Sequence, residues 1–94
     1  MHYVTAILRA QAGHEDTVAA ALAELTLASR KEPGCLRYEL FRQHNGQVFV
    51  TQETWVDEAA ESAHMRGDNV ATAVTKAGRY FDGPPDIHRC TLLV

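Results

Sequence analysis

Three residues in the central third of the chain could act together in proton transfer: Tyr38, Glu53 and His64. A carboxylate hydrogen-bonded to an imidazole fixes the tautomer of the ring and makes it a better proton acceptor near neutral pH, as a general base requires. A phenol beside this pair can hold an oxygen atom of a ligand by a hydrogen bond. These residue types predict a candidate catalytic site in which Glu53 orients His64.

A predicted β-hairpin brings the phenol and the carboxylate together. Asn45-Gly46 lies between two alternating segments, 35–43 and 48–56, and this dipeptide favours a type I′ turn with positive φ at both central residues. Counting outward from the turn places Tyr38 opposite Glu53 and Leu36 opposite Trp55. Side chains alternate between the two faces of a strand. One face of the hairpin is therefore predicted to carry Leu36, Tyr38, Leu40, Phe49, Thr51, Glu53 and Trp55.

This face is the predicted ligand-binding surface. It is apolar apart from a phenol, a hydroxyl and a carboxylate, and the indole offers a flat wall for a planar ligand. The alternative is a buried Glu–His or Glu–Tyr pair that only satisfies polar groups in the core. The predicted substrate contacts are Trp55, Leu36, Leu40, Phe49 and Thr51.

The elements that must position these residues follow a β-α-β-β-α-β order. The pattern predicts a strand over 2–10, an amphipathic helix over 14–31 stopped by Pro33-Gly34, the hairpin, a helix after Asp57, a second helical run over 68–77 and a strand over 86–94. His64 is predicted to point inward, and Glu61 to lie on another side of its helix. The fold class is α+β, a single ferredoxin-like domain over 1–94 with a four-stranded antiparallel sheet and both helices on one face.

The second face of the sheet has no cover within the chain. A sheet with apolar residues on both faces needs a partner, so the sequence predicts a homodimer in which two open faces meet. In the hairpin this face carries Arg37, Glu39, Phe41, Val48, Val50, Gln52 and Thr54.

Composition argues against several classes of protein. The 94 residues have a net charge of -3 and scattered basic residues, which argues against nucleic-acid binding. No apolar run approaches the roughly 20 residues of a membrane span, and no secretory signal is apparent. Cys35 and Cys90 are interpreted as reduced thiols of a cytoplasmic protein, although a disulfide between them stays open. The other histidines, at positions 2, 14, 44 and 88, lack metal-ligand spacing, so neither a metal nor another cofactor is predicted.

At these residues the sequence resembles the antibiotic biosynthesis monooxygenase family of quinol monooxygenase-like, dimeric α+β barrel proteins. The resemblance implies a dimer and a pocket between sheet and helices. In the best-studied members it also implies oxidation of phenolic or quinol-like aromatics by O₂ without metal or flavin. Glu53, Trp55 and His64 match positions that the family shares, and Tyr38 matches its tyrosine after Pro-Gly-Cys. The matching segments are Glu32-Pro33-Gly34-Cys35-Leu36-x-Tyr38-Glu39, Phe49 to Glu53-x-Trp55-x-Asp57, Ala59-Ala60 with His64, and Gly83-Pro84-Pro85.

The chain departs from the family pattern in two places. Many relatives carry Ser-Pro-His-Phe or a similar segment directly after the helix histidine, whereas Met65-Arg66-Gly67-Asp68-Asn69-Val70 follows His64 here, so the second pocket histidine is missing. The first strand also lacks the asparagine of haem-degrading members. The leading hypothesis is a cofactor-independent monooxygenase in which His64 deprotonates a small aromatic that O₂ then oxidises. A non-catalytic binding or stress-response dimer is the alternative from another class. An isomerase is the third, and it would need Arg66 or Arg79 to reach the pocket.

Overall fold

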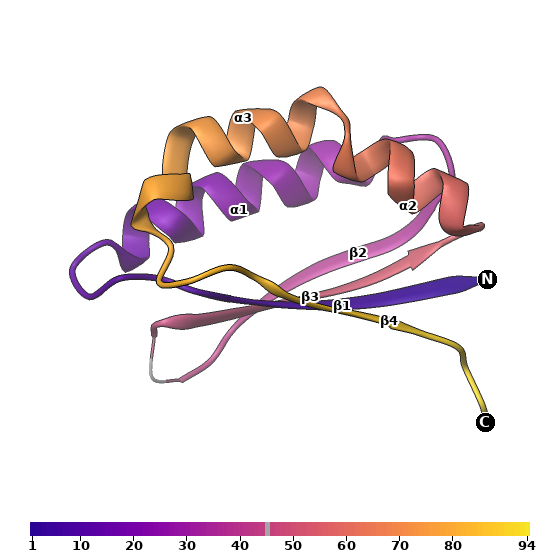
Figure 1. Ribbon diagram of the computed structural model, residues 1–94, viewed down its shortest axis with the longest axis horizontal. Helices are drawn as coiled ribbons and strands as arrows, with labels where there is room; N and C mark the ends of the chain where they lie inside the picture. Colours follow the sequence, from indigo (N-terminus) through magenta and orange to yellow (C-terminus); the bar gives the residue numbers. More distant parts are fainter. Residues whose placement is uncertain (45) are drawn as a thin grey trace.

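The computed structural model describes residues 1–44 and 46–94, which form an antiparallel sheet with all helices on one face (Figure 1). This confirms the predicted ferredoxin-like α+β class, with the second helical region divided in two. The last strand is shorter than predicted, and residues 91–94 continue as exposed chain. The elements in order are β1 (His2–Arg9), α1 (Glu15–Ser29), β2 (Cys35–Arg42), β3 (Val48–Trp55), α2 (Glu58–Met65), α3 (Asp68–Ala77), the 3₁₀ helix η1 (Gly78–Tyr80) and β4 (Asp86–Cys90).

The sheet has the strand order β2-β3-β1-β4, with every neighbouring pair antiparallel. Strand β1 is central and shows the two-residue period of a strand that is covered on one side. Val4, Ala6 and Leu8 are buried under the helices, and the residues between them are only half-buried. The sheet therefore presents one apolar floor to the helical layer.

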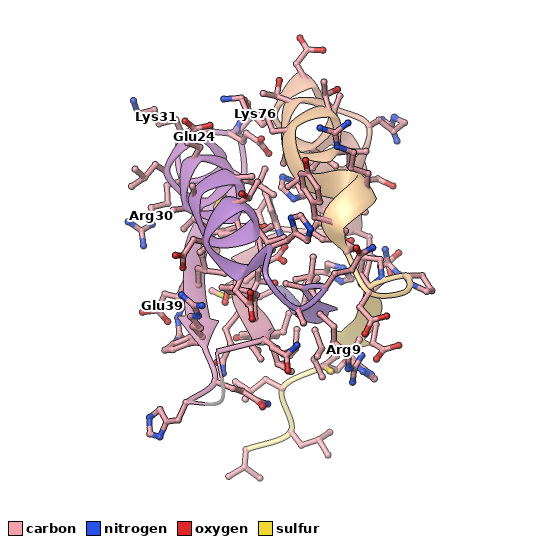
Figure 2. The ribbon with its side chains drawn as sticks, turned by 90° about the vertical axis from the view of Figure 1, so that its left-hand side faces the viewer. Arg9, Glu24, Arg30, Lys31, Glu39 and Lys76 are labelled. Carbon is pink, nitrogen blue, oxygen red and sulfur yellow. The ribbon has the colours of Figure 1, made fainter. Side chains whose placement is uncertain are left out.

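Helices α1 and α3 lie side by side over this floor, and α2 lies at one end of it (Figure 1). The inner stripe of α1 buries Val18, Ala21 and Leu22. On the outer surface, Lys76 of α3 donates a hydrogen bond of 2.6 Å to Glu24 of α1, and both side chains face solvent (Figure 2). Because solvent-exposed ion pairs contribute little to stability, apolar packing rather than this ion pair holds the helical layer on the sheet.

The hairpin register agrees with the prediction next to the site and differs from it at the far end. Tyr38 lies opposite Glu53, as expected, whereas the turn type predicted at Asn45 falls outside the described residues. A β-bulge between Cys35 and Arg37 shifts the pairing, so Cys35 and not Leu36 lies opposite Trp55. The predicted position of Leu36 is wrong because the bulge inserts one extra residue, and its side chain is 53% exposed.

Gly34 determines how closely α2 approaches the start of β2. Its φ of +81° lies in the left-handed region, and a Cβ there would stand 2.7 Å from Ala60 Cβ and 2.9 Å from Val56 Cγ2. Only glycine satisfies both conditions without strain. Gly34 therefore allows the helix that carries His64 to pack against the hairpin.

The two cysteines lie on opposite edges of the sheet and both are free thiols. Three strand spacings separate β2 from β4, about 14 Å, whereas a disulfide needs Cα atoms within about 7 Å. This excludes the Cys35–Cys90 disulfide within one chain that the sequence left open.

Candidate functional site

A cavity of about 160 Å³ lies between the sheet and the helical layer. Its walls are mostly apolar and come from all the strands and helices around it, with a few polar groups among them, which is the usual composition of a small-molecule site. The residues that line it are Val4, Ala6, Leu8, Leu22, Leu25, Tyr38, Thr51, Glu53, Glu61, His64, Met65, Val70, Ala73, Val74, Phe81, Pro85 and Ile87.

The structure brings the three predicted catalytic residues to this one cavity. Tyr38 and Glu53 reach it from paired positions of β2 and β3, and the imidazole of His64 reaches it from α2. The centroids of the Tyr38 and His64 rings are 5.5 Å apart. Asp57 caps α2 by accepting the N–H of Ala60 at 2.9 Å, which sets the start of the helix. His64 is 4% exposed, so the prediction that it points inward is confirmed.

The acid that holds His64 is Glu32, not Glu53. Glu32 Oε1 lies 2.8 Å from His64 Nδ1, and Ser29 Oγ lies 3.5 Å from the same nitrogen. Glu32 Oε2 in turn accepts a hydrogen bond of 2.7 Å from Asn69. We assign the proton to Nδ1, because a carboxylate only accepts. Nε2 is then the ring nitrogen with a free lone pair, and the predicted pairing with Glu53 is wrong.

Glu53 is instead held by its own strand. Thr51 Oγ1 donates to Oε2 at 2.7 Å and Trp55 Nε1 donates to Oε1 at 3.0 Å. Two donors on a 7% exposed carboxyl group suit an acceptor with a fixed orientation. Glu53 is therefore a rigid acceptor in the cavity wall.

Tyr38 is held in its neutral form. Burial raises the pKa of the Tyr38 phenol well above its usual range, and the charges of Glu53 and Glu32 raise it further. Ser29 is a hydrogen-bond partner of the phenol. A phenol that keeps its proton can donate a hydrogen bond to a ligand but cannot serve as a base near neutral pH. Tyr38 is therefore a hydrogen-bond donor in the cavity wall rather than a proton acceptor.

The sequence interpretation missed Glu61, which was expected on another side of its helix. It is 3% exposed and lines the cavity. Arg89 donates to both carboxylate oxygens, at 2.8 and 2.9 Å, and His2 Nε2 lies 2.8 Å from Oε1. Burial favours the neutral acid, but these hydrogen bonds outweigh it and lower the pKa of Glu61. One feature of the sequence could have indicated this acid: Arg89 shares a strand face with Ile87 toward the helices, where a buried carboxylate would be its partner.

Of the five predicted substrate contacts, Thr51 lines the cavity and four residues do not. Leu36 points to solvent because of the bulge, Phe49 is buried in the apolar core, and Leu40 is partly buried against that core. Trp55 is fully buried behind the wall, with its ring 4.8 Å from that of His64. The indole therefore supports Glu53 and His64 rather than touching a ligand.

The apolar wall opposite the sheet was also missed, because only the hairpin face was considered. It is formed by inward stripes of α1 and α3 and by the segment after η1. The isomerase alternative needs Arg66 or Arg79 in the pocket, and neither is among the lining residues. The residues concerned are Leu22, Leu25, Val70, Ala73, Val74, Phe81 and Pro85.

Across residues 1–44 and 46–94, no group of three or more His, Cys, Asp or Glu side chains is placed to hold a metal ion. No helix in the same part of the chain has both the length and the hydropathy to cross a membrane.

The chain is similar in sequence and in fold to known proteins. A family model described as "Antibiotic biosynthesis monooxygenase" matches residues 1–76. A solved antibiotic biosynthesis monooxygenase is 25% identical over 100% of both chains, with a TM-score of 0.93. PA3566 from Pseudomonas aeruginosa is 26% identical over 99% of this chain and 94% of its own, with a TM-score of 0.89.

Not every relative has a described function. NE2512 from Nitrosomonas europaea, a protein of unknown function, is 25% identical over 99% of this chain and 89% of its own, with a TM-score of 0.85. No curated protein shows a significant match to the chain. Similarity therefore leaves the substrate and the reaction to be argued from the site.

Proposed function

Because the chain belongs to the antibiotic biosynthesis monooxygenase family, we propose that it is a cofactor-independent monooxygenase that oxidises a small phenol- or quinol-like aromatic with O₂. The observation that carries this proposal is the placement of His64. Its Nδ1 is held by a carboxylate 2.8 Å away, while the ring lines an apolar cavity. An oriented imidazole beside a largely apolar cavity suits removal of a phenolic proton.

The reaction begins when His64 Nε2 takes the phenolic proton of the bound aromatic. The phenolate transfers one electron to O₂, and the resulting phenoxyl radical and superoxide combine to form a carbon–oxygen bond on the ring. Loss of water from this peroxide leaves a quinone. His64 returns its proton to the outer peroxide oxygen, and the O–O bond and the ring C–H bond at the attacked carbon then break. One oxygen atom of O₂ stays on the ring, and the other leaves as water with the two protons.

The other polar groups orient the substrate. Tyr38 donates a hydrogen bond to a substrate oxygen, and Glu53 accepts one from a second hydroxyl group. The carboxylates of Glu53 and Glu61 line the cavity, so a neutral molecule with hydroxyl groups suits it better than a phosphate or a carboxylate. The apolar wall accommodates the ring and excludes water from the radical pair.

We also propose that the enzyme is a cytoplasmic homodimer through the sheet face away from the helices, which no element covers in Figure 1. Phe41 on this face is 46% exposed, and Ile7 and Val50 are only half-buried. Phe41→Asp would place a charge at the interface and should convert a dimer to a monomer in sedimentation at micromolar concentration. Arg66→Asp on the helical layer is the control, and a monomeric unsubstituted protein would refute the pairing.

Oxygen uptake in the presence of hydroquinones and anthrones tests the reaction. We expect consumption of O₂ with quinone formation, and a loss of about 100-fold or more in kcat for His64→Ala. Turnover that persists without O₂, or that is unchanged in the His64→Ala variant, would exclude the mechanism.

A non-catalytic binding protein is the second candidate. It is favoured by the fact that Glu53 and His64 Nδ1 already have partners within the protein, as groups with a purely structural role would. Trp55, the only tryptophan, lies next to these groups and reports binding. Quenching of its fluorescence by quinones without any oxygen uptake would support this candidate instead.

A further inference from the structure

His64 lies between two hollows of the molecule. One is the cavity, and the other is a surface hollow lined by Glu32, Asp68, Asn69 and neighbouring residues of the turns around α2. Glu32 lines only the surface hollow. Its side chain is 17% exposed, whereas that of His64 is 3% exposed. The acid therefore holds the imidazole from the side opposite to the substrate and within reach of solvent.

We propose that Glu32 is the positioning residue of the reaction, holding His64 in the Nδ1–H tautomer and stabilising its protonated form; this inference rests on the function proposed above. During the reaction Nε2 receives the phenolic proton, and the ring becomes an imidazolium in a largely apolar cavity. A carboxylate 2.8 Å from Nδ1 offsets that charge. When the peroxide loses water, Nε2 returns the proton and the Glu32–His64 pair regains its starting state.

The surroundings of Glu32 support this role over a purely structural one. Asn69 donates to its second oxygen at 2.7 Å, which restrains the carboxylate while its other oxygen contacts Nδ1. Outer partners of this kind fix the tautomer and orientation of a functional histidine. Glu53 does not hold His64 in this structure: its oxygens accept from Thr51 and Trp55, and Nδ1 of the imidazole is held by Glu32.

Other ionisable groups lie around His64, and a test of Glu32 must leave these residues unchanged. Tyr38 and Glu53 face it from β2 and β3, Glu61 lies on its own helix at the cavity wall, and Asp68 of α3 lines the surface hollow. Asp68 forms the matched control, because Asp68→Asn removes the same charge from the same hollow without touching the imidazole.

Two variants separate charge from shape. Glu32→Gln keeps the volume and an oxygen acceptor but removes the charge, so we expect kcat to fall about tenfold or more with KM nearly unchanged, and the acid limb of the pH profile to move to lower pH. Glu32→Ala leaves a gap that opens to solvent. Formate should enter this gap and restore part of kcat, while having no effect on His64→Ala or on Asp68→Asn.

A measurement on the resting protein decides the role of Glu32 independently of turnover. Nitrogen-15 NMR should show neutral His64 as the Nδ1–H tautomer in the unsubstituted protein and in Asp68→Asn, and a shift towards Nε2–H in Glu32→Ala. If no aromatic is oxidised, the proposed function fails while this spectrum still tests the tautomer. An Nε2–H tautomer in the unsubstituted protein, or full activity of Glu32→Gln without any shift of the pH profile, would overturn the inference.

Discussion

Arg89 on the edge strand β4 donates to both carboxylate oxygens of Glu61 on α2, with Nε at 2.8 Å and Nη2 at 2.9 Å. Glu61 is nearly fully buried, whereas half of the Arg89 side chain remains exposed. This contact joins the last strand to the helix that carries His64. A charged pair therefore links the edge strand to the cavity wall.

The first prediction concerns the stability of the Arg89–Glu61 pair at acidic pH. The pKa of Glu61 is lowered in the folded protein despite burial. The ionised Glu61 therefore contributes its full stabilisation of the fold above the pKa of the unfolded chain, about 4.3, and this contribution is lost as the pH falls through the lower pKa of the folded protein. Glu61→Gln should cost of the order of 1–2 kcal/mol at pH 7, because hydrogen bonds to a charged group are lost. In urea unfolding the difference from the unsubstituted protein should shrink below about pH 4.

Glu58→Gln is the control for that series, since it makes the same charge change on an exposed position of the same helix. It should have little effect at any pH. A Glu61→Gln penalty that stays constant down to pH 3 would show that the pair does not depend on the charge of the acid.

The second prediction concerns Gly34. Alanine there would meet both a left-handed backbone and atoms within 3 Å. Gly83 has a similar φ of +79°, and an added Cβ there would meet no atom within 4 Å. The loss of unfolding free energy in Gly83→Ala therefore measures the cost of the left-handed backbone alone, about 1–2 kcal/mol. Gly34→Ala should cost about 1–3 kcal/mol more because of the overpacking. If urea unfolding shows the same loss of unfolding free energy in Gly34→Ala and Gly83→Ala, α2 moves away from the hairpin without cost.

The third prediction separates Tyr38 from the base. Tyr38→Phe keeps the edge-on contact with Trp55, at 6.3 Å between centroids, and removes only the hydroxyl. One hydrogen bond of about 0.5–1.4 kcal/mol corresponds to a rise of roughly two- to tenfold in KM. Since the pKa of Tyr38 is raised well above its usual range, the pH profiles of both proteins should run parallel up to about pH 9. A basic limb lost in Tyr38→Phe would contradict the neutral donor role.

The fourth prediction concerns the thiols. Burial raises the pKa of the Cys35 thiol, and the charges of Glu32 and Glu53 raise it further, so little thiolate forms at pH 7.5. Cys90 is exposed. Cys90 lies on the sheet face proposed as the dimer interface, so the monomeric Phe41→Asp variant is the protein to test. Iodoacetamide followed by mass spectrometry should modify Cys90 of this variant well before Cys35, and the two rates should converge in urea. Faster modification of Cys35 in the folded protein would contradict its burial.

The local pattern of the sequence was sufficient for the elements and for part of the site. Counting outward from the predicted turn placed Tyr38 opposite Glu53, and the helical spacing after Asp57 turned His64 inward, as the structure confirms. Both results depend on local geometry, namely the register that a short hairpin loop sets and the capping and period of a helix. Sequence also indicated the family, whose model matches residues 1–76.

Tertiary structure alone decided which charged groups meet. Glu32 reaches His64 across 32 positions of sequence, and Arg89 reaches Glu61 across 28. One bulge residue was enough to turn Leu36 from the predicted ligand surface to solvent. Backbone periodicity determines the direction in which a side chain points, but long-range packing determines its distance from other segments. The strength of a hydrogen bond depends on that distance within a few tenths of an ångström.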